Sequence, residues 1–167
     1  MVAGERAFNF LAGISVLGWS IAGIRLDWPE LGPVRLSVSC LNAVVGFLLI
    51  SRGQERALAE PRAALLTIPS FLLCGLLFRW SQAEGSSWSS FASWLFVVAT
   101  GWTVVSLLCL GRSFAVIPSL RTVVTRGTYG WIRHPVYLGE MGLAGICAWA
   151  TGHPGSGVLF MGVVIAV

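Results

Sequence analysis

The sequence predicts an all-α integral membrane protein, a polytopic bundle of transmembrane helices with five spans and the beginning of a sixth. Charged residues make up 11% of the 167 residues, whereas about 25% is usual in a soluble domain. Hydrophobic residues reach 56%, and the mean hydropathy is +0.80. The apolar segments are continuous rather than alternating, which indicates helices, because only helices or closed barrels satisfy backbone polar groups in lipid. We therefore expect one integral membrane domain over 1–167.

The predicted spans follow from segment length. A bilayer core about 30 Å thick takes roughly 20 helical residues, with a working range of about 17–25. The predicted spans are 8–24, 36–50, 63–78, 91–110 and 136–150, followed by 157–167 as an incomplete sixth. The second and third are short, but flanking arginines can extend to the headgroups. Because 157–167 is too short to cross, we expect the natural chain to continue beyond Val167.

The arginines divide unevenly between the two predicted faces of the membrane, and the chain has no lysine. The face of the N-terminus receives eight: Arg6, Arg52, Arg56, Arg62, Arg112, Arg121, Arg126 and Arg133. The opposite face receives three: Arg25, Arg35 and Arg79. Because cytoplasmic loops are enriched in basic residues, we expect a multi-pass protein with its N-terminus and the loop 111–135 in the cytoplasm. Trp28, Trp80 and Trp88 would then lie at the opposite interface.

Composition also argues against two kinds of partner. The net charge of +4 accompanies apolar spans, so it indicates membrane topology rather than nucleic-acid binding. The cysteines lie inside apolar stretches, and none is within metal-ligand spacing of another: Cys40, Cys74, Cys109 and Cys147. We expect no nucleic acid, no metal and no disulfide bond.

The loop 111–135 is the longest polar segment, with four arginines and no acidic residue. Binding of anionic lipid alone would account for its charge. Its prolines and glycines indicate a defined path, and its aromatic side chains could fold onto the membrane or a ligand. At its end, we expect His134 to be extended because it precedes a proline. Pro135 should open the fifth span, because proline is favoured at the first position of a helix.

The start of that span gathers polar groups. The backbone N–H groups and positive dipole of the helix would point toward the cytoplasm beside Arg133 and His134. Tyr137 and Glu140 are three residues apart, so they share a helix face. A charge inside a span costs about 2.5–3.5 kcal/mol at the bilayer centre, so Glu140 should face the protein interior. Two roles remain open for it: an ion pair with an arginine such as Arg133 or Arg112, or a carboxylate that binds a cationic or hydroxylated ligand.

Three motifs lie in and after the loop: Gly111-Arg112-Ser113-Phe114, Val124-Thr125-Arg126-Gly127-Thr128-Tyr129 and Arg133-His134-Pro135-Val136-Tyr137-Leu138-Gly139-Glu140. Together they resemble the isoprenylcysteine carboxyl methyltransferase family, which is related to phospholipid methyltransferases. The resemblance covers about Gly111 to Met141. It implies a membrane enzyme that transfers a methyl group from S-adenosylmethionine to a lipid-like acceptor, an isoprenylcysteine carboxylate or another isoprenoid or lipid.

The resemblance further implies a cofactor site open to the cytoplasm, with membrane lipids around it. Its cofactor-binding residues would be Val124, Thr125, Gly127, Tyr129, Arg133, His134, Tyr137 and Glu140. Catalytic residues stay unassigned, because the family's acidic and Arg-containing C-terminal segment has no counterpart before Val167. Thr128 stands where the family commonly has proline.

Two other functions remain open. Membrane sterol and steroid reductases, which use NADPH, have a similar Arg-His-Pro-x-Tyr-x-Gly-Glu sequence, although they usually have asparagine where this chain has Val136. A non-catalytic membrane fragment that lacks the C-terminal segment is the third reading.

Overall fold

The computed structural model describes residues 2–26, 28–29, 31–51, 88–114 and 124–150. Every regular element in these ranges is a helix, so the all-α fold class is confirmed for the described part. The α-helices are α1 (Val2–Leu26), α2 (Pro33–Ser51), α4 (Ser90–Leu110) and α5 (Pro135–Ala150). Two short 3-10 helices lie between α4 and α5: η1 (Gly111–Ser113) and η2 (Gly127–Gly130).

Three of the helices are long and apolar enough to cross a membrane, which supports an integral membrane protein. Their membrane-compatible segments are Asn9–Leu26, Pro33–Ser51 and Ser90–Leu110, close to the first, second and fourth predicted spans. α5 gives a helix at the fifth predicted span, but its 16 residues make it shorter than the other three. The predicted spans 63–78 and 157–167 lie outside the described residues.

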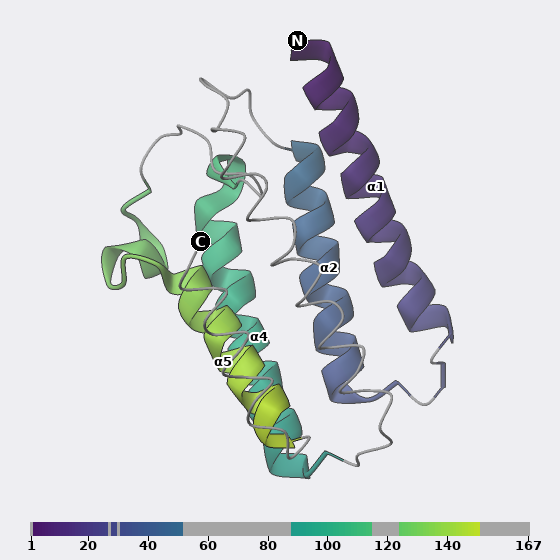
Figure 1. The fold of residues 1–167 in the computed structure, drawn as a ribbon, viewed down its shortest axis with the longest axis vertical. Helices are drawn as coiled ribbons and strands as arrows, with labels where there is room; N and C mark the ends of the chain where they lie inside the picture. Colours follow the sequence, from purple (N-terminus) through teal and green to yellow (C-terminus); the bar gives the residue numbers. More distant parts are fainter. Residues whose placement is uncertain (1, 27, 30, 52–87, 115–123, 151–167) are drawn as a thin grey trace.

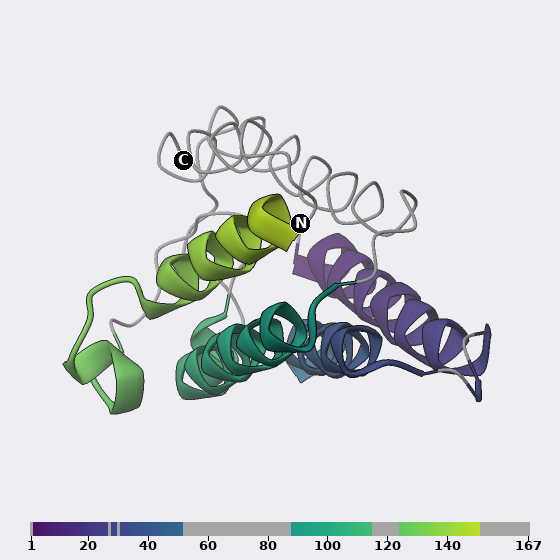
Figure 2. The same ribbon diagram turned by 90° about the horizontal axis from the view of Figure 1, so that it is seen from below.

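The four α-helices pack in the order α1, α2, α4, α5 (Figures 1 and 2). The N-terminus of α1 and the C-termini of α2 and α4 lie at one end of the bundle, and α5 begins lower, beside the middle of α4, and runs toward the other end (Figure 1). We call the first of these the loop end, because the chain between α4 and α5 leaves the bundle there. The beginning of α1 and the described parts of the loop, 111–114 and 124–134, thus lie on the same side of the bundle, and the predicted topology with its cytoplasmic face remains a prediction.

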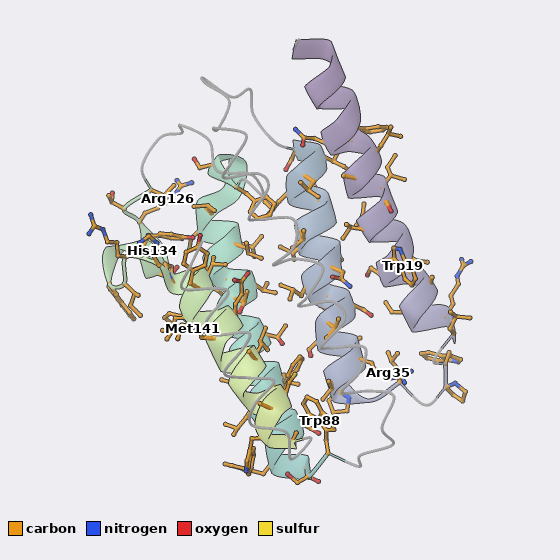
Figure 3. All side chains as sticks on the ribbon, viewed as in Figure 1. Trp19, Arg35, Trp88, Arg126, His134 and Met141 are labelled. Atoms are coloured by element: carbon orange, nitrogen blue, oxygen red, sulfur yellow. The ribbon has the colours of Figure 1, made fainter. Side chains whose placement is uncertain are left out.

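The predicted aromatic belt falls at the other end. Trp28 follows the C-terminus of α1, and Trp88 precedes the N-terminus of α4 (Figure 3 labels Trp88). Arg35, in the first turn of α2, lies toward the same end (Figure 3). Trp80 lies outside the described residues.

Small residues let α1 and α2 approach closely. A Cβ atom on Gly13 would lie 2.8 Å from the Gly46 carbonyl oxygen, and one on Gly46 would lie 2.9 Å from the Gly13 carbonyl oxygen. Across the same interface, Ser20 Oγ donates a 2.7 Å hydrogen bond to the Ser39 carbonyl oxygen. Close backbone approach with hydroxyl hydrogen bonds is typical of helix pairs in membranes, where lipid is as apolar as the helix surfaces.

The apolar interior is small, and the outer surface is apolar as well. One buried cluster joins α2 to the C-terminal end of α4: Leu48, Leu49, Leu107 and Phe114. Many larger apolar side chains stay exposed, among them Leu11, Trp19, Phe91, Trp94 and Val98. Soluble monomers rarely expose large contiguous apolar patches, so these side chains are placed to contact lipid.

Cysteine labelling tests the predicted orientation. Thr125 lies near the loop end and Ser90 at the other end, and both are exposed. In a cysteine-free variant, a membrane-impermeant maleimide should label Ser90→Cys in intact cells and Thr125→Cys only after lysis, because basic loops stay in the cytoplasm. Labelling of Thr125→Cys in intact cells would reverse the orientation.

Candidate functional site

The start of α5 is fixed to α4. The helix begins at Pro135, as predicted, and the Pro135 side chain is fully buried. Trp102 Nε1 of α4 donates a 2.9 Å hydrogen bond to the Pro135 carbonyl oxygen. The first helical hydrogen bond runs from Leu138 N–H to the His134 carbonyl oxygen at 3.2 Å. The N–H groups of the preceding helical residues are therefore outside the helical ladder and available to a ligand.

α4 and α5 approach most closely one turn further along. Gly139 of α5 lies directly against Thr103 of α4, and a Cβ atom there would collide with the Thr103 hydroxyl. The hydroxyls along this stretch of α4 donate to carbonyl oxygens of their own helix: Thr100 to Phe96 at 2.8 Å, Thr103 to Ala99 at 2.9 Å and Ser106 to Trp102 at 2.8 Å. The interface therefore buries hydroxyl groups that already have acceptors.

The η2 turn lies against the last turn of α4. Gly127 has a φ of +61°, a conformation that favours glycine. A Cβ atom on Gly127 would lie 2.5 Å from Cys109 Sγ, so no larger residue fits this approach. The N–H groups of Trp131 and Ile132 both donate to the Thr128 carbonyl oxygen, at 3.2 and 3.1 Å. The turn is thus closed by its own hydrogen bonds.

Tyr129 of η2 interacts electrostatically with the first turns of α5. Burial raises the pKa of the Tyr129 phenol above its ordinary value of 10.0, and Cys109, Tyr137 and Glu140 raise it further. Tyr137 and Glu140 are thus close enough to Tyr129 for their charges to interact. The rings of His134 and Tyr137 stack, with centroids 5.5 Å apart and planes 16° from parallel. We call Tyr129, His134, Tyr137 and Glu140 the aromatic–carboxylate cluster.

Glu140 is the acidic member of this cluster. Its side chain is half-buried in the second turn of α5, and within the described part it makes no hydrogen bond or ion pair. Arg133, one of the partners that the sequence left open, is exposed and does not pair with it. The side chain of Arg112 lies outside the described part. A carboxylate withdrawn from water is costly without a cation or donor, and the described residues provide neither to Glu140.

The other predicted cofactor residues lie in the chain on either side of η2. Val124 is half-buried and Thr125 exposed, and both precede η2. Arg133 and His134 are exposed in the short link between η2 and α5. Within the described ranges, no hydrogen bond or ion pair joins Val124, Thr125 or Arg133 to the cluster. The structure therefore groups Tyr129, His134, Tyr137 and Glu140, with Gly127 holding the turn that carries Tyr129.

Sequence reasoning missed the supporting residues on α4, because it treated the span 91–110 as uniformly apolar. Thr100, Thr103 and Ser106 recur at every third position, which is a signal of a helix–helix contact in a membrane. Trp102 lies within the span, where an indole N–H needs a partner. No local signal indicated that Cys109 lies beneath Gly127.

In chemical terms the site joins a half-buried carboxylate, two phenol rings, an imidazole and a helix N-terminus. Carboxylates and aromatic faces stabilise cations, whereas helix N-termini stabilise anions. The described residues therefore offer groups of both kinds. No protein-family model, no curated protein and no solved structure matches the chain.

Proposed function

We propose that the protein is a membrane methyltransferase that transfers a methyl group from S-adenosylmethionine to a lipid-like acceptor, an isoprenylcysteine carboxylate or another isoprenoid or lipid. The observation that carries this proposal is Glu140, a half-buried carboxylate beside two tyrosines that has no cationic partner in the described part of the chain. A ligand with a sulfonium and an ammonium group would supply the missing positive charge.

The residues of the cluster suit such a cofactor. S-Adenosylmethionine supplies an electrophilic methyl group on a sulfonium when it is bound. Tyr129 and Tyr137 would offer their ring faces to positive charge, and Glu140 would balance it. The first N–H groups of α5 would bind the cofactor carboxylate. His134 would hold the Tyr137 ring in orientation through their stack.

The membrane setting suits the acceptor. We place the protein in the bilayer with five spans and the beginning of a sixth, the loop end in the cytoplasm and the cluster where α5 enters the lipid. A lipid-like acceptor would reach the site sideways from the bilayer, and the cofactor would reach it from the cytoplasm. The rate of such a displacement depends mostly on positioning and on exclusion of water, so the protein needs few reacting groups of its own.

Cofactor titration of detergent-solubilised protein tests this function. S-Adenosylmethionine should bind and NADPH should not. Glu140→Gln keeps the side-chain shape and removes its charge, so affinity should fall by about ten- to a hundredfold, the equivalent of about 1.5–3 kcal/mol for a bond to a charged group. The thermal unfolding midpoint should hold, because no ion pair within the described part is lost.

Arg25→Gln is the matched control for loss of a charge, because Arg25 is exposed in the last turn of α1, at the other end of the bundle. It should bind S-adenosylmethionine like the wild type. Binding of NADPH alone would support the reductase, and binding of neither compound would contradict a methyltransferase.

A further inference from the structure

Trp131 projects from the end of η2 into the surroundings. It is 86% exposed, more than any other large hydrophobic residue in the described part. Its backbone N–H donates to the Thr128 carbonyl oxygen at 3.2 Å, so the exposed side chain extends from a closed turn rather than from an open strand. Tryptophan is enriched where membrane meets water, because its ring is apolar and its N–H needs a polar partner.

Two arginines flank this tryptophan. Arg126 immediately precedes η2 and Arg133 follows it, and both are exposed. Neither has an ion pair among the described residues. The whole loop 111–135 has no acidic residue, and the next carboxylate along the chain, Glu140, interacts electrostatically with Tyr129. Among the described residues, nothing therefore neutralises the positive charge of the turn.

The position of η2 sets its level relative to the membrane. α4 is 21 residues long and apolar enough to cross, and η2 packs on its last turn where Gly127 meets Cys109. On the membrane placement proposed above, the beginning of the turn lies near the level where α4 leaves the hydrocarbon core, next to the layer of phospholipid headgroups. Figure 3 shows Arg126 and His134 on the outer side of the bundle, beside the start of α5.

We propose that Arg126, Trp131 and Arg133 form a seat for anionic phospholipid headgroups, with the indole in the interface and the guanidinium groups on phosphate. A guanidinium group can donate two parallel hydrogen bonds to phosphate oxygens. Exposed positive charge beside an exposed indole suits a lipid surface better than a protein–protein interface, because the centre of such an interface is depleted of charge. The seat does not depend on methyl transfer. Because the same turn carries Tyr129, lipid bound at the seat would also fix one side of the aromatic–carboxylate cluster.

Quenching of Trp131 fluorescence by brominated lipid tests this seat. The protein is reconstituted into nanodiscs of phosphatidylserine and phosphatidylcholine at equal mole fractions, with brominated acyl chains on one lipid or the other. The difference between the wild type and Trp131→Phe isolates the Trp131 signal. Trp131 should be quenched at least about twofold more by brominated phosphatidylserine, because each basic residue near an anionic surface contributes about fivefold to lipid affinity.

Two comparisons assign that preference to the arginines. Arg126→Gln combined with Arg133→Gln should leave Trp131 quenched equally by both lipids, whereas Arg25→Gln at the other end should keep the preference. In the wild type, high salt should weaken the preference of Trp131 for brominated phosphatidylserine, because salt screens the charges. This measurement tests the contribution of the arginine charges even if the double variant folds poorly. Absence of quenching by either lipid, as expected if Trp131 lies in water away from the bilayer, would overturn the proposal, as would equal quenching of the wild type.

Discussion

Replacing either His134 or Tyr137 by alanine should weaken the binding of S-adenosylmethionine by about ten- to a hundredfold, because contacts to a charged ligand are worth about 1.5–3 kcal/mol. The centroids of the two rings lie 5.5 Å apart in a stack, so each variant removes one ring and also the contact that orients the other ring. Folding should change little, because His134 is exposed and Tyr137 is 43% exposed. Equilibrium dialysis with labelled cofactor measures the affinity, and thermal unfolding in detergent checks the fold.

Three control variants separate the ring from its surroundings. Tyr137→Phe keeps the ring face and should retain most of the affinity if cation–π contact dominates. Leu138→Ala removes a neighbour in the same turn that is 49% exposed, and it should bind like the wild type. His153→Ala removes the other histidine of the chain, which lies outside the described residues, between the predicted spans 136–150 and 157–167, and is therefore expected on the face opposite the N-terminus. Equal losses of S-adenosylmethionine affinity in Tyr137→Ala and Leu138→Ala would indicate that either substitution destabilises the first turn of α5, and would not support Tyr137 as a binding residue.

The sequence could predict the helices because the physical signals for them are local. A long run without charge, such as 91–110, has few alternatives to a helix in lipid, and the structure gives Ser90–Leu110. The beginning of α5 could be predicted equally well. The ring of Pro135 suits the first helical position, and proline has no backbone N–H that would need a partner there. The spacing of Tyr137 and Glu140 then placed them on one face without further information.

The assembly of the site could not be predicted, because its contacts join residues far apart in the sequence. Trp102 bonds to the Pro135 carbonyl oxygen across 33 positions, and Cys109 packs beneath Gly127 across the loop. No periodicity encodes either pair. The Trp102 contact follows from how α4 and α5 pack. That packing depends on Gly139, and the need for glycine there becomes evident only when its neighbour Thr103 is known.

Glu140 shows how sequence proximity can mislead. Arg133 seemed a natural partner because it is near in the chain and opposite in charge. However, Arg133 precedes Pro135 and therefore lies outside α5, where helical spacing no longer governs which side chains meet. Among the described residues, Glu140 instead interacts electrostatically with Tyr129, which comes from η2.

Gly139→Ala should be strongly destabilising, with a loss of about 1–3 kcal/mol from overpacking. The new methyl group would meet the Thr103 hydroxyl, and it would lie 3.2 Å from Thr103 Cβ and 3.3 Å from Thr103 Cα. Rotation of the threonine could move the hydroxyl but not the Cα atom, so α4 and α5 would have to separate. That separation would shift Glu140, the next residue, and S-adenosylmethionine affinity should fall together with the unfolding midpoint.

A matched substitution on the same helix gives the comparison. Gly145→Ala places a methyl group with nothing within 4 Å, so it should leave the midpoint unchanged or raise it, since glycine inside a helix costs roughly 0.5–1 kcal/mol relative to alanine. Thr103→Ala in the Gly139→Ala background removes the colliding hydroxyl and should restore part of the lost stability, a coupling that a double-mutant cycle measures directly. If Gly139→Ala and Gly145→Ala unfold at the same temperature, or if Thr103→Ala gives no recovery, then α4 and α5 do not meet at Gly139, and the placement of Glu140 beside Tyr129 loses its support.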